Sequence, residues 1–140
     1  MGYCFEHQVR FHETDGAGVV YFANELTMCH AAYEASLAAA GLDLGTFFKA
    51  EVVAYPVVHA SIDYCRPLGC GDRITIDLTP TRLDDNCFEI QYLVKLDDAV
   101  AAQALTQHVC IEVATRRRYP LPAAMEQWLE RWGNSAAPLN

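Results

Sequence analysis

Basic residues and long apolar runs are both scarce in this sequence. Ten Lys and Arg residues face eighteen Asp and Glu residues, which gives a formal net charge of −8. Nucleic acids and anionic membranes attract basic surfaces, so we expect neither as a partner. No apolar run approaches the ~20 residues of a membrane-spanning helix. The first residues also lack the basic and apolar regions of a secretion signal, so we expect a cytoplasmic protein.

Zinc-ligand spacing is also absent. The six cysteines include no C-x-x-C pair, so we expect no structural metal site. Without a secretion signal, free thiols in a reducing compartment are expected in place of disulfides. A catalytic cysteine is the alternative, and it would need surroundings that stabilise the thiolate. The cysteines are Cys4, Cys29, Cys65, Cys70, Cys87 and Cys110.

The sequence does contain enough apolar material for one core. Hydrophobic residues make up 52% of the 140 residues and charged residues 20%, which is typical of a globular domain. A chain of this length has no room for two independent cores. We therefore expect one domain over residues 1–133 and a flexible tail over residues 134–140.

Apolar periodicity predicts one long helix and a run of strands. Steps of three and four residues predict a helix over about residues 24–40, with Asn24 as N-cap and with Glu25 where the helix dipole favours negative charge. A short amphipathic helix containing Trp128 ends at Gly133. The short polar turns and the separation of helix from strands indicate an antiparallel, α+β fold. Alternation with a period of two predicts strands over about residues 5–11, 57–66, 73–82, 88–96 and 99–113.

One loop carries the most informative chemistry. Asp15 lies in a loop with Gly16 and Gly18, directly before an apolar stretch and the predicted helix start. Glycine lets the backbone approach a ligand, and a helix N-terminus presents N–H groups that can hold a developing oxyanion. A carboxylate beside such groups could act as a nucleophile or a general base. Taken alone, the spacing also fits an ordinary Asp-Gly turn.

Two segments resemble a known enzyme family. The segment Asp-Gly-Ala-Gly-Val-Val-Tyr-Phe over residues 15–22, followed by a long helix, resembles the signature of hot-dog-fold acyl-CoA thioesterases of the 4-hydroxybenzoyl-CoA thioesterase type. The segment Ile-Asp-Tyr-Cys-Arg-Pro-Leu-Gly-Cys-Gly-Asp over residues 62–72 resembles the family's second recurrent block. The resemblance extends from about Phe5 to Pro122. It implies a hot-dog fold, in which a curved antiparallel sheet of about five strands wraps a long central helix.

Within this family the chain is most similar to a cyanobacterial branch. Enzymes of that branch hydrolyse 1,4-dihydroxy-2-naphthoyl-CoA and release a precursor of phylloquinone (vitamin K1). The resemblance therefore implies a thioester hydrolase with an aromatic acyl-CoA substrate. Coenzyme A is part of that substrate, so no separate cofactor is implied. The similarity is carried by residues 14–22, 28–34, 58–63 and 108–111.

The resemblance assigns the catalytic groups to the first segment. The family's catalytic Asp falls on Asp15, and its polarising backbone N–H falls on Phe22. Asp15 would either attack the thioester carbon, giving a mixed anhydride, or activate a water molecule that does so. Some hot-dog thioesterases use a helical Glu instead. With Asp15 present, we interpret Glu34, four residues after His30, as a structural partner.

The resemblance also implies an acyl site shared between subunits. Family active sites form across a homodimer interface, and the dimers can pair further into a homotetramer. His59 could form a hydrogen bond to a substrate hydroxyl, or it could be a strand histidine that a neighbour satisfies. The candidate acyl-site residues are Gly18, Val19 and Tyr21, together with Val58, His59 and Ser61 from the partner subunit.

One basic cluster could bind the phosphates of coenzyme A. Arg116, Arg117 and Arg118 lie just after the last strand, where the family has phosphate contacts. The alternative is a solvated run of charge. The turn over residues 84–86 reads Asp-Asp-Asn, although family members can carry basic residues there. We therefore expect the phosphates to lie largely in solvent.

Three other functions stay open. An apolar slot discriminates weakly between apolar groups, so a general aryl- or short-chain acyl-CoA thioesterase is the first alternative. A hot-dog hydratase is the second, but it pairs the Asp with a His five residues later, where this chain has Val20. A non-catalytic acyl-CoA-binding module is the third, and the intact Asp15 loop argues against it.

Overall fold

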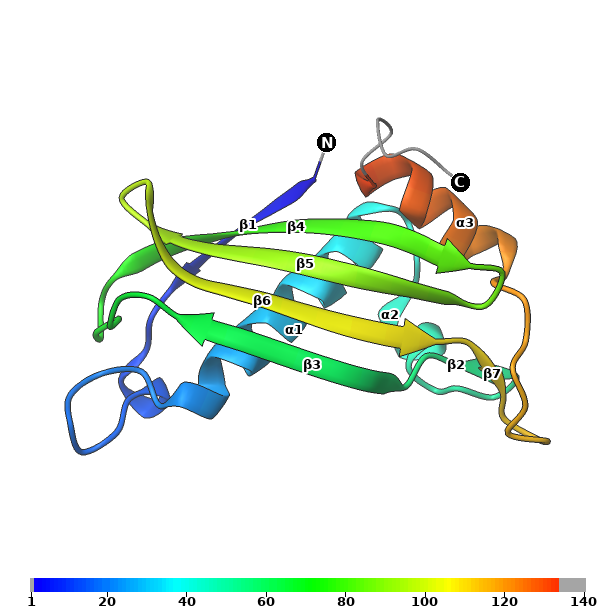
Figure 1. Cartoon of the computed structure of the whole chain (residues 1–140), viewed down its shortest axis with the longest axis horizontal. Helices are drawn as coiled ribbons and strands as arrows, with labels where there is room; N and C mark the ends of the chain where they lie inside the picture. Colours follow the sequence, from blue (N-terminus) through cyan, green and yellow to red (C-terminus); the bar gives the residue numbers. More distant parts are fainter. Residues whose placement is uncertain (1, 134–140) are drawn as a thin grey trace.

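The computed structural model describes residues 2–133 of the chain. The tail predicted over residues 134–140 lies outside these described residues. In chain order the elements are β1 (Tyr3–Gln8), the 3-10 helix η1 (Phe11–Glu13), α1 (Phe22–Ala39), α2 (Leu44–Phe47), β2 (Val53–Ala54), β3 (Val57–Tyr64), β4 (Arg73–Asp84), β5 (Cys87–Leu96), β6 (Ala99–Val109), β7 (Ile111–Glu112) and α3 (Ala123–Trp132) (Figure 1).

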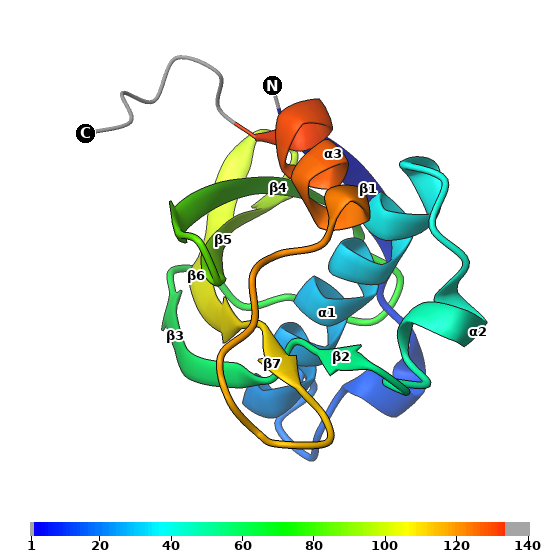
Figure 2. The same cartoon turned by 90° about the vertical axis from the view of Figure 1, so that its right-hand side faces the viewer.

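One antiparallel sheet supplies most of the architecture. Its five strands lie in the order β1-β4-β5-β6-β3, and each neighbouring pair is antiparallel. The sheet curves around α1, which lies on the inner side of the curve (Figure 2). Helix α3 contacts both α1 and β4. The predicted α+β fold with a five-stranded antiparallel sheet is confirmed.

Helix α1 packs on the sheet through one buried face. The buried positions recur at steps of three and four residues, as expected for a helix that covers a core. Ser36 also holds α3 in place, because the indole N–H of Trp128 donates to its hydroxyl oxygen at 2.9 Å. The buried apolar residues of this face are Met28, Cys29, Ala32, Tyr33 and Leu37.

The long helix begins earlier than its sequence pattern predicts. Helix α1 starts at Phe22, so the N-cap is Tyr21 and Asn24 lies inside the first turn. The Asn24 side chain still satisfies a backbone group, because its amide donates to the carbonyl of Glu13 at 2.9 Å. The prediction of Asn24 as N-cap is therefore wrong, although its side chain does pair with the segment before the helix.

Strand β1 is shorter than predicted and ends at Gln8. Val9 bonds to the loop before β4, with its N–H donating to Asp72 at 2.9 Å and its carbonyl accepting from Gly71 at 2.8 Å. Beyond Val9 the chain turns into η1, so Phe11 lies in a 3-10 helix and not in a strand. Alternation alone could not locate this turn.

The predicted strand over residues 99–113 is two strands. Strand β6 ends at Val109, and the N–H of Cys110 donates to the carbonyl of Asn86 at 2.7 Å, which interrupts the ladder. Strand β7 then pairs with β2 in a separate two-stranded sheet. The sequence pattern predicted neither β2 nor α2, because elements of two and four residues are too short to show a period.

Candidate active site

The Asp15 loop is a tight turn that closes directly before α1. The N–H of Asp15 donates to the carbonyl of Val19 at 2.9 Å, and the N–H of Gly18 donates to the carbonyl of Asp15 at 3.0 Å. Inside the turn, the N–H of Ala17 donates to Asp15 Oδ1 at 2.8 Å. Gly18 has a φ of 81°, in the left-handed region that favours glycine. The loop thus holds the Asp15 carboxylate in place and leaves it exposed.

Glu13 ties this loop to β1 and to the start of α1. Its carbonyl accepts from the N–H of Tyr21 at 2.9 Å as well as from the Asn24 amide. Its carboxylate accepts from the N–H of Arg10 at 2.7 Å and lies 2.9 Å from His7 Nε2. Burial raises the pKa of the Glu13 carboxyl, but the hydrogen bonds from Arg10 and His7 outweigh burial and hold the pKa below its ordinary value. An ionised Glu13 therefore braces the base of the loop.

The N-terminus of α1 offers backbone N–H groups next to the loop. Phe22 is the first helical residue, so its N–H has no acceptor within the helix. The N-cap residue, Tyr21, provides no side-chain hydrogen bond to the helix. Unpaired N–H groups and the helix dipole together favour a negative charge at this position.

A pocket of about 410 Å³ joins the loop, the start of α1 and the end of β3. This volume is within the range of small-molecule sites. The loop and α1 contribute Asp15, Val19, Tyr21 and Phe22, and the other wall is the segment over residues 64–68. The pocket therefore brings a carboxylate, a helix N-terminus and apolar side chains together.

Glu25 is a second acid in this pocket. It lies one turn after Phe22 on α1, and only 4% of its surface is exposed. Its Oε1 atom is sealed from solvent and has no hydrogen-bond partner among residues 2–133. Burial raises the pKa of the Glu25 carboxyl to about 7. The sequence suggested an ionised acid paired with the helix dipole, whereas the structure shows a buried one.

Tyr64 connects the end of β3 to the start of α1. Its hydroxyl donates to the carbonyl of Phe22 at 2.7 Å, and the two rings meet edge to face with centroids 6.5 Å apart. Burial, followed by the nearby Glu25, raises the pKa of the Tyr64 hydroxyl above its ordinary value. Arg66 lies in the same wall with an exposed side chain. The hydrogen bond between Tyr64 and Phe22 thus joins the two walls of the pocket where the helix begins.

The structure brings one group of predicted site residues together. Val19, Tyr21 and Phe22 line the pocket beside Asp15, and Gly18 lies in the Asp15 loop. These residues come from one continuous segment, so the sequence could predict their proximity.

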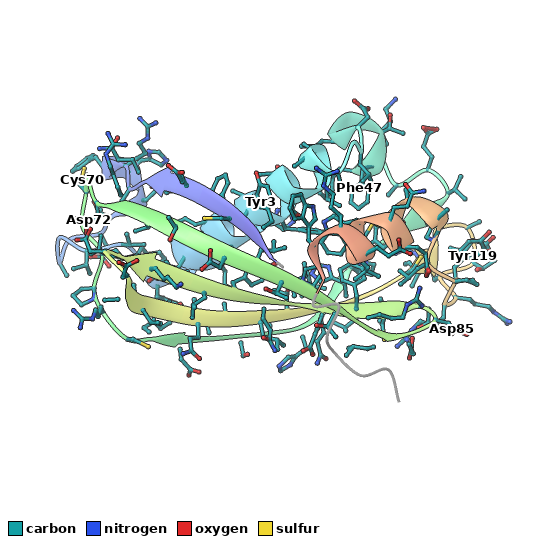
Figure 3. The ribbon with its side chains drawn as sticks, turned by 90° about the horizontal axis from the view of Figure 1, so that it is seen from above. Tyr3, Phe47, Cys70, Asp72, Asp85 and Tyr119 are labelled. Carbon is teal, nitrogen blue, oxygen red and sulfur yellow. The ribbon has the colours of Figure 1, made fainter. Side chains whose placement is uncertain are left out.

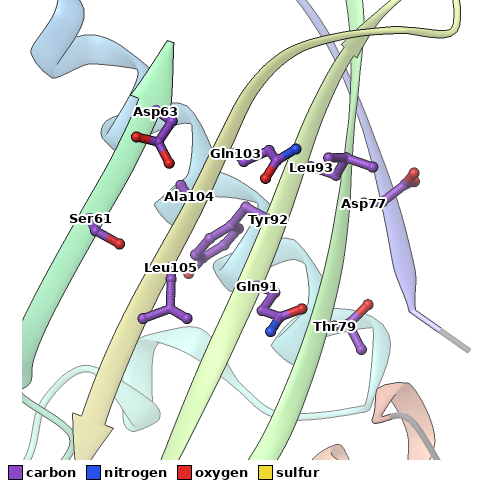
Figure 4. A pocket seen from close by; sticks show the side chains of 10 residues that line it. All are labelled: Ser61, Asp63, Asp77, Thr79, Gln91, Tyr92, Leu93, Gln103, Ala104 and Leu105. Atoms are coloured by element: carbon purple, nitrogen blue, oxygen red, sulfur yellow. The ribbon is translucent and has the colours of Figure 1, made fainter. Parts of the chain in front are cut away.

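The predicted residues of β3 do not join that pocket within this chain. Ser61 lies in a separate hollow of about 410 Å³ on the outer face of the sheet, turned away from α1 (Figure 4). His59 lies two residues earlier on β3 and shares the outer face. Val58 lies at a β-bulge and is 59% exposed.

The predicted phosphate-binding cluster, residues 116–118, lies far from Asp15. It occupies a turn after β7, and this turn and the loop before α1 are at opposite ends of the molecule (Figure 1). Figure 3 shows the same separation, with Tyr119 at one end and Asp72 at the other. One chain alone therefore does not place these arginines at the pocket.

The remaining candidate groups are the pair formed by His30 and Glu34 and the cysteines. Glu34 Oε2 lies 2.7 Å from His30 Nδ1, which agrees with the interpretation of Glu34 as a structural partner. The six cysteines, all within the described residues, are free. Cys29 adjoins His30 in sequence, but burial and the nearby Glu25 raise the pKa of its thiol to about 12, so it is a poor nucleophile.

Two kinds of feature are missing from the part of the chain that the structure describes. Residues 2–133 contain no group of three or more His, Cys, Asp or Glu side chains that could hold a metal ion. Over the same residues, no helix has the length and apolar character needed to cross a membrane.

A comparison with family models shows which family the chain belongs to. The model described as the thioesterase-like superfamily matches residues 9–129. The chain belongs to this superfamily. The family predicted from the Asp15 segment is thereby confirmed.

Several similar members of the superfamily are named for the same activity. The 1,4-dihydroxy-2-naphthoyl-CoA hydrolase of Nostoc punctiforme is 47% identical over 130 residues, which cover 93% of this chain and 88% of the relative. The hydrolase of the same name from Rippkaea orientalis is 49% identical over 134 residues, covering 94% and 97%. The crystal structure of Slr0204, a 1,4-dihydroxy-2-naphthoyl-CoA thioesterase from Synechocystis, matches with a TM-score of 0.88 at 39% identity, covering 92% and 96%. The fold of the chain is the hot-dog fold of these thioesterases.

The sequence alone did not point to Glu25 or to the far wall of the pocket. Tyr64 and Arg66 line the pocket but entered the sequence analysis only as part of the second recurrent block, and Glu25 entered it only as an acid near the helix N-terminus. The signal that could have pointed to them is the second recurrent block, which contains Tyr64 and Arg66 and would suggest a wall next to the first block. No local signal marks the burial of Glu25.

Proposed function

We propose that the chain hydrolyses the thioester bond of 1,4-dihydroxy-2-naphthoyl-CoA, releasing 1,4-dihydroxy-2-naphthoate and CoA. The observation that carries the proposal is the pocket in which the Asp15 carboxylate and the N-terminus of α1 meet. The names of the relatives support the choice of acyl group. The reaction then belongs to phylloquinone biosynthesis.

Hydrolysis needs an electrophile activated toward attack and a group that delivers oxygen. The thioester carbonyl oxygen accepts a hydrogen bond from the N–H of Phe22, which stabilises the negative charge that develops on this oxygen. Asp15 either attacks the carbonyl carbon, giving a mixed anhydride that water cleaves, or takes a proton from the attacking water. The C–S bond breaks, and the CoA thiolate leaves and takes up a proton. The proposal includes no cofactor, because these groups supply both requirements.

The acyl group occupies the apolar part of the pocket, between the Asp15 loop and the segment over residues 64–68. A planar aromatic acyl group fits walls that include Val19, Tyr21 and Phe22. We place the reaction in the cytoplasm, and the six free thiols fit a reducing compartment.

The proposed working form is a homodimer joined at β3. This strand is at the edge of the main sheet and carries exposed apolar side chains, with Val57 48%, Val58 59% and Tyr64 45% exposed. Such an edge is a template for pairing with another chain. Antiparallel pairing about a two-fold axis brings the start of the partner's β3 beside the end of this β3.

This dimer completes the site. The end of β3 borders the Asp15 pocket, whereas its start lies toward the end of the molecule that carries residues 116–118 (Figure 1). Pairing therefore brings the partner subunit's Val58 and its arginine cluster toward Asp15, where the arginines contact CoA phosphates. His59 and Ser61 remain on the outer face of the joined sheet. That face is left free for two dimers to pair into a homotetramer.

The test is CoA release from a panel of thioesters, followed chromatographically. The panel contains 1,4-dihydroxy-2-naphthoyl-, 4-hydroxybenzoyl-, benzoyl-, a short-chain and a long-chain acyl-CoA. Chromatography is preferable to a thiol dye because three of the cysteines are exposed and would react. A strong preference for the dihydroxynaphthoyl thioester supports the proposal. Broad or aliphatic activity would replace it with a general thioesterase, and retention of intact thioester without turnover would indicate a binding module.

A further inference from the structure

The pocket contains a carboxyl group that the hydrolysis does not use. Glu25 lies three residues after Phe22, and residues at this spacing share one face of a helix. Asp15 is exposed and accepts a hydrogen bond from Ala17, whereas Glu25 is buried and its Oε1 has no partner in the described chain. Glu25 therefore borders the acyl pocket with hydrogen-bonding capacity to spare.

Several other buried polar side chains have partners. Thr106 bonds to His108 at 2.9 Å and lies 3.1 Å from the Tyr92 hydroxyl, and Ser36 bonds to Trp128. Among residues 2–133, only Glu25 and Tyr33 contain a sealed polar side-chain atom without a partner. Tyr33 lies eight residues further along α1 and lines a different cavity. A buried carboxyl without a partner is unfavourable, so a ligand group that bonds to it gains affinity.

We propose that Glu25 recognises a hydroxyl group of the acyl part and makes the enzyme selective for hydroxylated aromatic acyl groups. The inference rests on the proposed function. It adds that the pocket recognises the acyl group by its hydroxyl. A carboxyl group suits this role because its oxygens accept a hydrogen bond from a phenolic O–H. Burial also raises the pKa of Glu25, so that a retained proton could donate to the hydroxyl oxygen in return.

The place of Glu25 on α1 also bears on which hydroxyl it contacts. The N–H of Phe22 holds the thioester carbonyl, and Glu25 lies one turn further along α1. In the dihydroxynaphthoyl group, the 1-hydroxyl is ortho to the thioester, whereas the 4-hydroxyl is meta to it and lies further away. We therefore assign the 4-hydroxyl, the more distant of the two from the thioester, to Glu25.

The test compares kcat/KM for three thioesters: 4-hydroxy-2-naphthoyl-CoA, 1-hydroxy-2-naphthoyl-CoA and unsubstituted 2-naphthoyl-CoA. The wild type should prefer the 4-hydroxy over the unsubstituted thioester by about 100-fold or more, since a site built to bond a hydroxyl rejects analogues that lack it. Glu25→Met should reduce this preference to about threefold, chiefly by slowing the 4-hydroxy thioester. Glu25→Gln keeps the shape and a polar group, so its preference should lie between the two. Glu34→Gln, on the same helix but paired with His30, is the control and should keep the wild-type ratio.

The outcomes separate this inference from the proposed function. Equal rates on all three thioesters by the wild type, or an unchanged 4-hydroxy preference in Glu25→Met, would overturn the role of Glu25 while leaving thioester hydrolysis intact. No activity on any naphthoyl thioester, with activity on aliphatic ones, would overturn both. If Glu25→Met fails to fold, Glu25→Gln decides, and a full wild-type ratio in that variant overturns the inference. As a measurement without turnover, 4-hydroxy-2-naphthoate should raise the Tm of the wild type more than 2-naphthoate does.

Discussion

Asp15 and Glu25 line the same pocket, but their carboxyl groups differ in exposure and in hydrogen bonding. Asp15 is exposed in a turn that donates an N–H to its Oδ1, so it stays available to a substrate or a water molecule. Glu25 is nearly fully buried, and its pKa is raised to about 7. Acids in one site whose environments differ in this way take different roles. We assign the hydrolysis step to Asp15 and the recognition of the acyl group to Glu25.

The burial of Glu25 predicts a pH-dependent stability difference. The carboxyl has a pKa of about 7 in the folded chain against 4.5 without burial, so the folded state binds more protons in between, and wild-type stability falls as pH rises across this window. Glu25→Met has no such group and should be more stable at pH 8, on the order of 2 kcal/mol. Thermal unfolding of both proteins between pH 4 and 8 measures this. The gain should grow with pH up to about 7 and then level off.

The control for that series is Glu34→Gln, which removes a more exposed carboxyl from the same helix. It should show no comparable growth of stability between pH 4.5 and 7. A Glu25→Met difference that stays constant with pH would show that Glu25 is not held in a desolvated state.

At the scale of residues, the sequence could predict the groups that one segment carries. Asp15 and Phe22 are seven positions apart, so a short loop and a helix start place them together. The sequence indicated Glu25 only as an acid in the first helical turn, because the segment over residues 64–68, which lines the pocket with it, comes from far along the chain. Tyr64 was missed for the same reason.

The loop before α1 is the element on which the site depends. Its conformation is set by the turn over residues 15–18 and by the braces from Glu13 on the preceding side. Val20 fastens the loop to the opposite wall, since its N–H donates to the carbonyl of Leu68 at 2.8 Å. The position of Asp15 relative to the helix N-terminus therefore follows from backbone geometry.

Gly18→Ala tests this dependence. Gly18 has a φ of 81°, and an L-residue in that conformation costs about 1–2 kcal/mol, so the variant should lose about that much stability or shift the turn. A shifted turn moves Asp15, so kcat should fall by about tenfold or more. Gly16→Ala is the matched control. Gly16 does not have a positive φ, and a Cβ added there would meet nothing within 4 Å. Equal effects of the two substitutions, in unfolding and in CoA release, would contradict this role of the turn.

At the scale of elements, the long periodic segments could be predicted and the short ones could not. The long helix and the five main strands are all present. Their boundaries differ from the prediction by a few residues where the backbone bonds to a loop, as at Val9 and Cys110. Elements α2 and β2 are too short to carry a period, and β7 was merged with β6. These errors lie away from the Asp15 loop.

At the scale of the whole molecule, the two ends of β3 lie near different functional groups. One end meets the Asp15 pocket, and the other lies toward the turn that holds the basic cluster (Figure 1). Arg118 is held there by Asn86, whose side-chain oxygen accepts from its guanidinium at 2.8 Å. The sequence could suggest these arginines as phosphate ligands, but sequence order cannot show that they lie too far from Asp15 in the same chain.

Mixing two variants that are impaired in different ways tests the shared site. In the proposed dimer, Asp15→Asn lacks the catalytic carboxylate, and a variant with Arg116, Arg117 and Arg118 all changed to alanine has a raised KM. A mixed dimer contains one site with Asp15 from one subunit and arginines from the other. Random mixing should therefore restore low-KM turnover at about one quarter of the wild-type number of sites. The measurement is KM and kcat of the mixture, with the mixed dimer verified by mass.

The two outcomes of mixing are distinct. Recovery of low-KM turnover shows that residues from two chains serve one site. No recovery, with mixed dimers present, would place the arginines outside the CoA site or show that each site is made by one chain.

The most direct measurement is the turnover of 1,4-dihydroxy-2-naphthoyl-CoA by Asp15→Asn against the wild type. Asn retains an oxygen that can accept from Ala17, so the loop should keep its shape and the Tm should change little. The lost carboxylate should lower kcat by about 100-fold or more. Asp63→Asn, an exposed carboxylate on the outer face of the sheet, is the control and should turn over normally. Near wild-type turnover by Asp15→Asn would contradict the assignment of the catalytic carboxylate and, with it, the proposed mechanism.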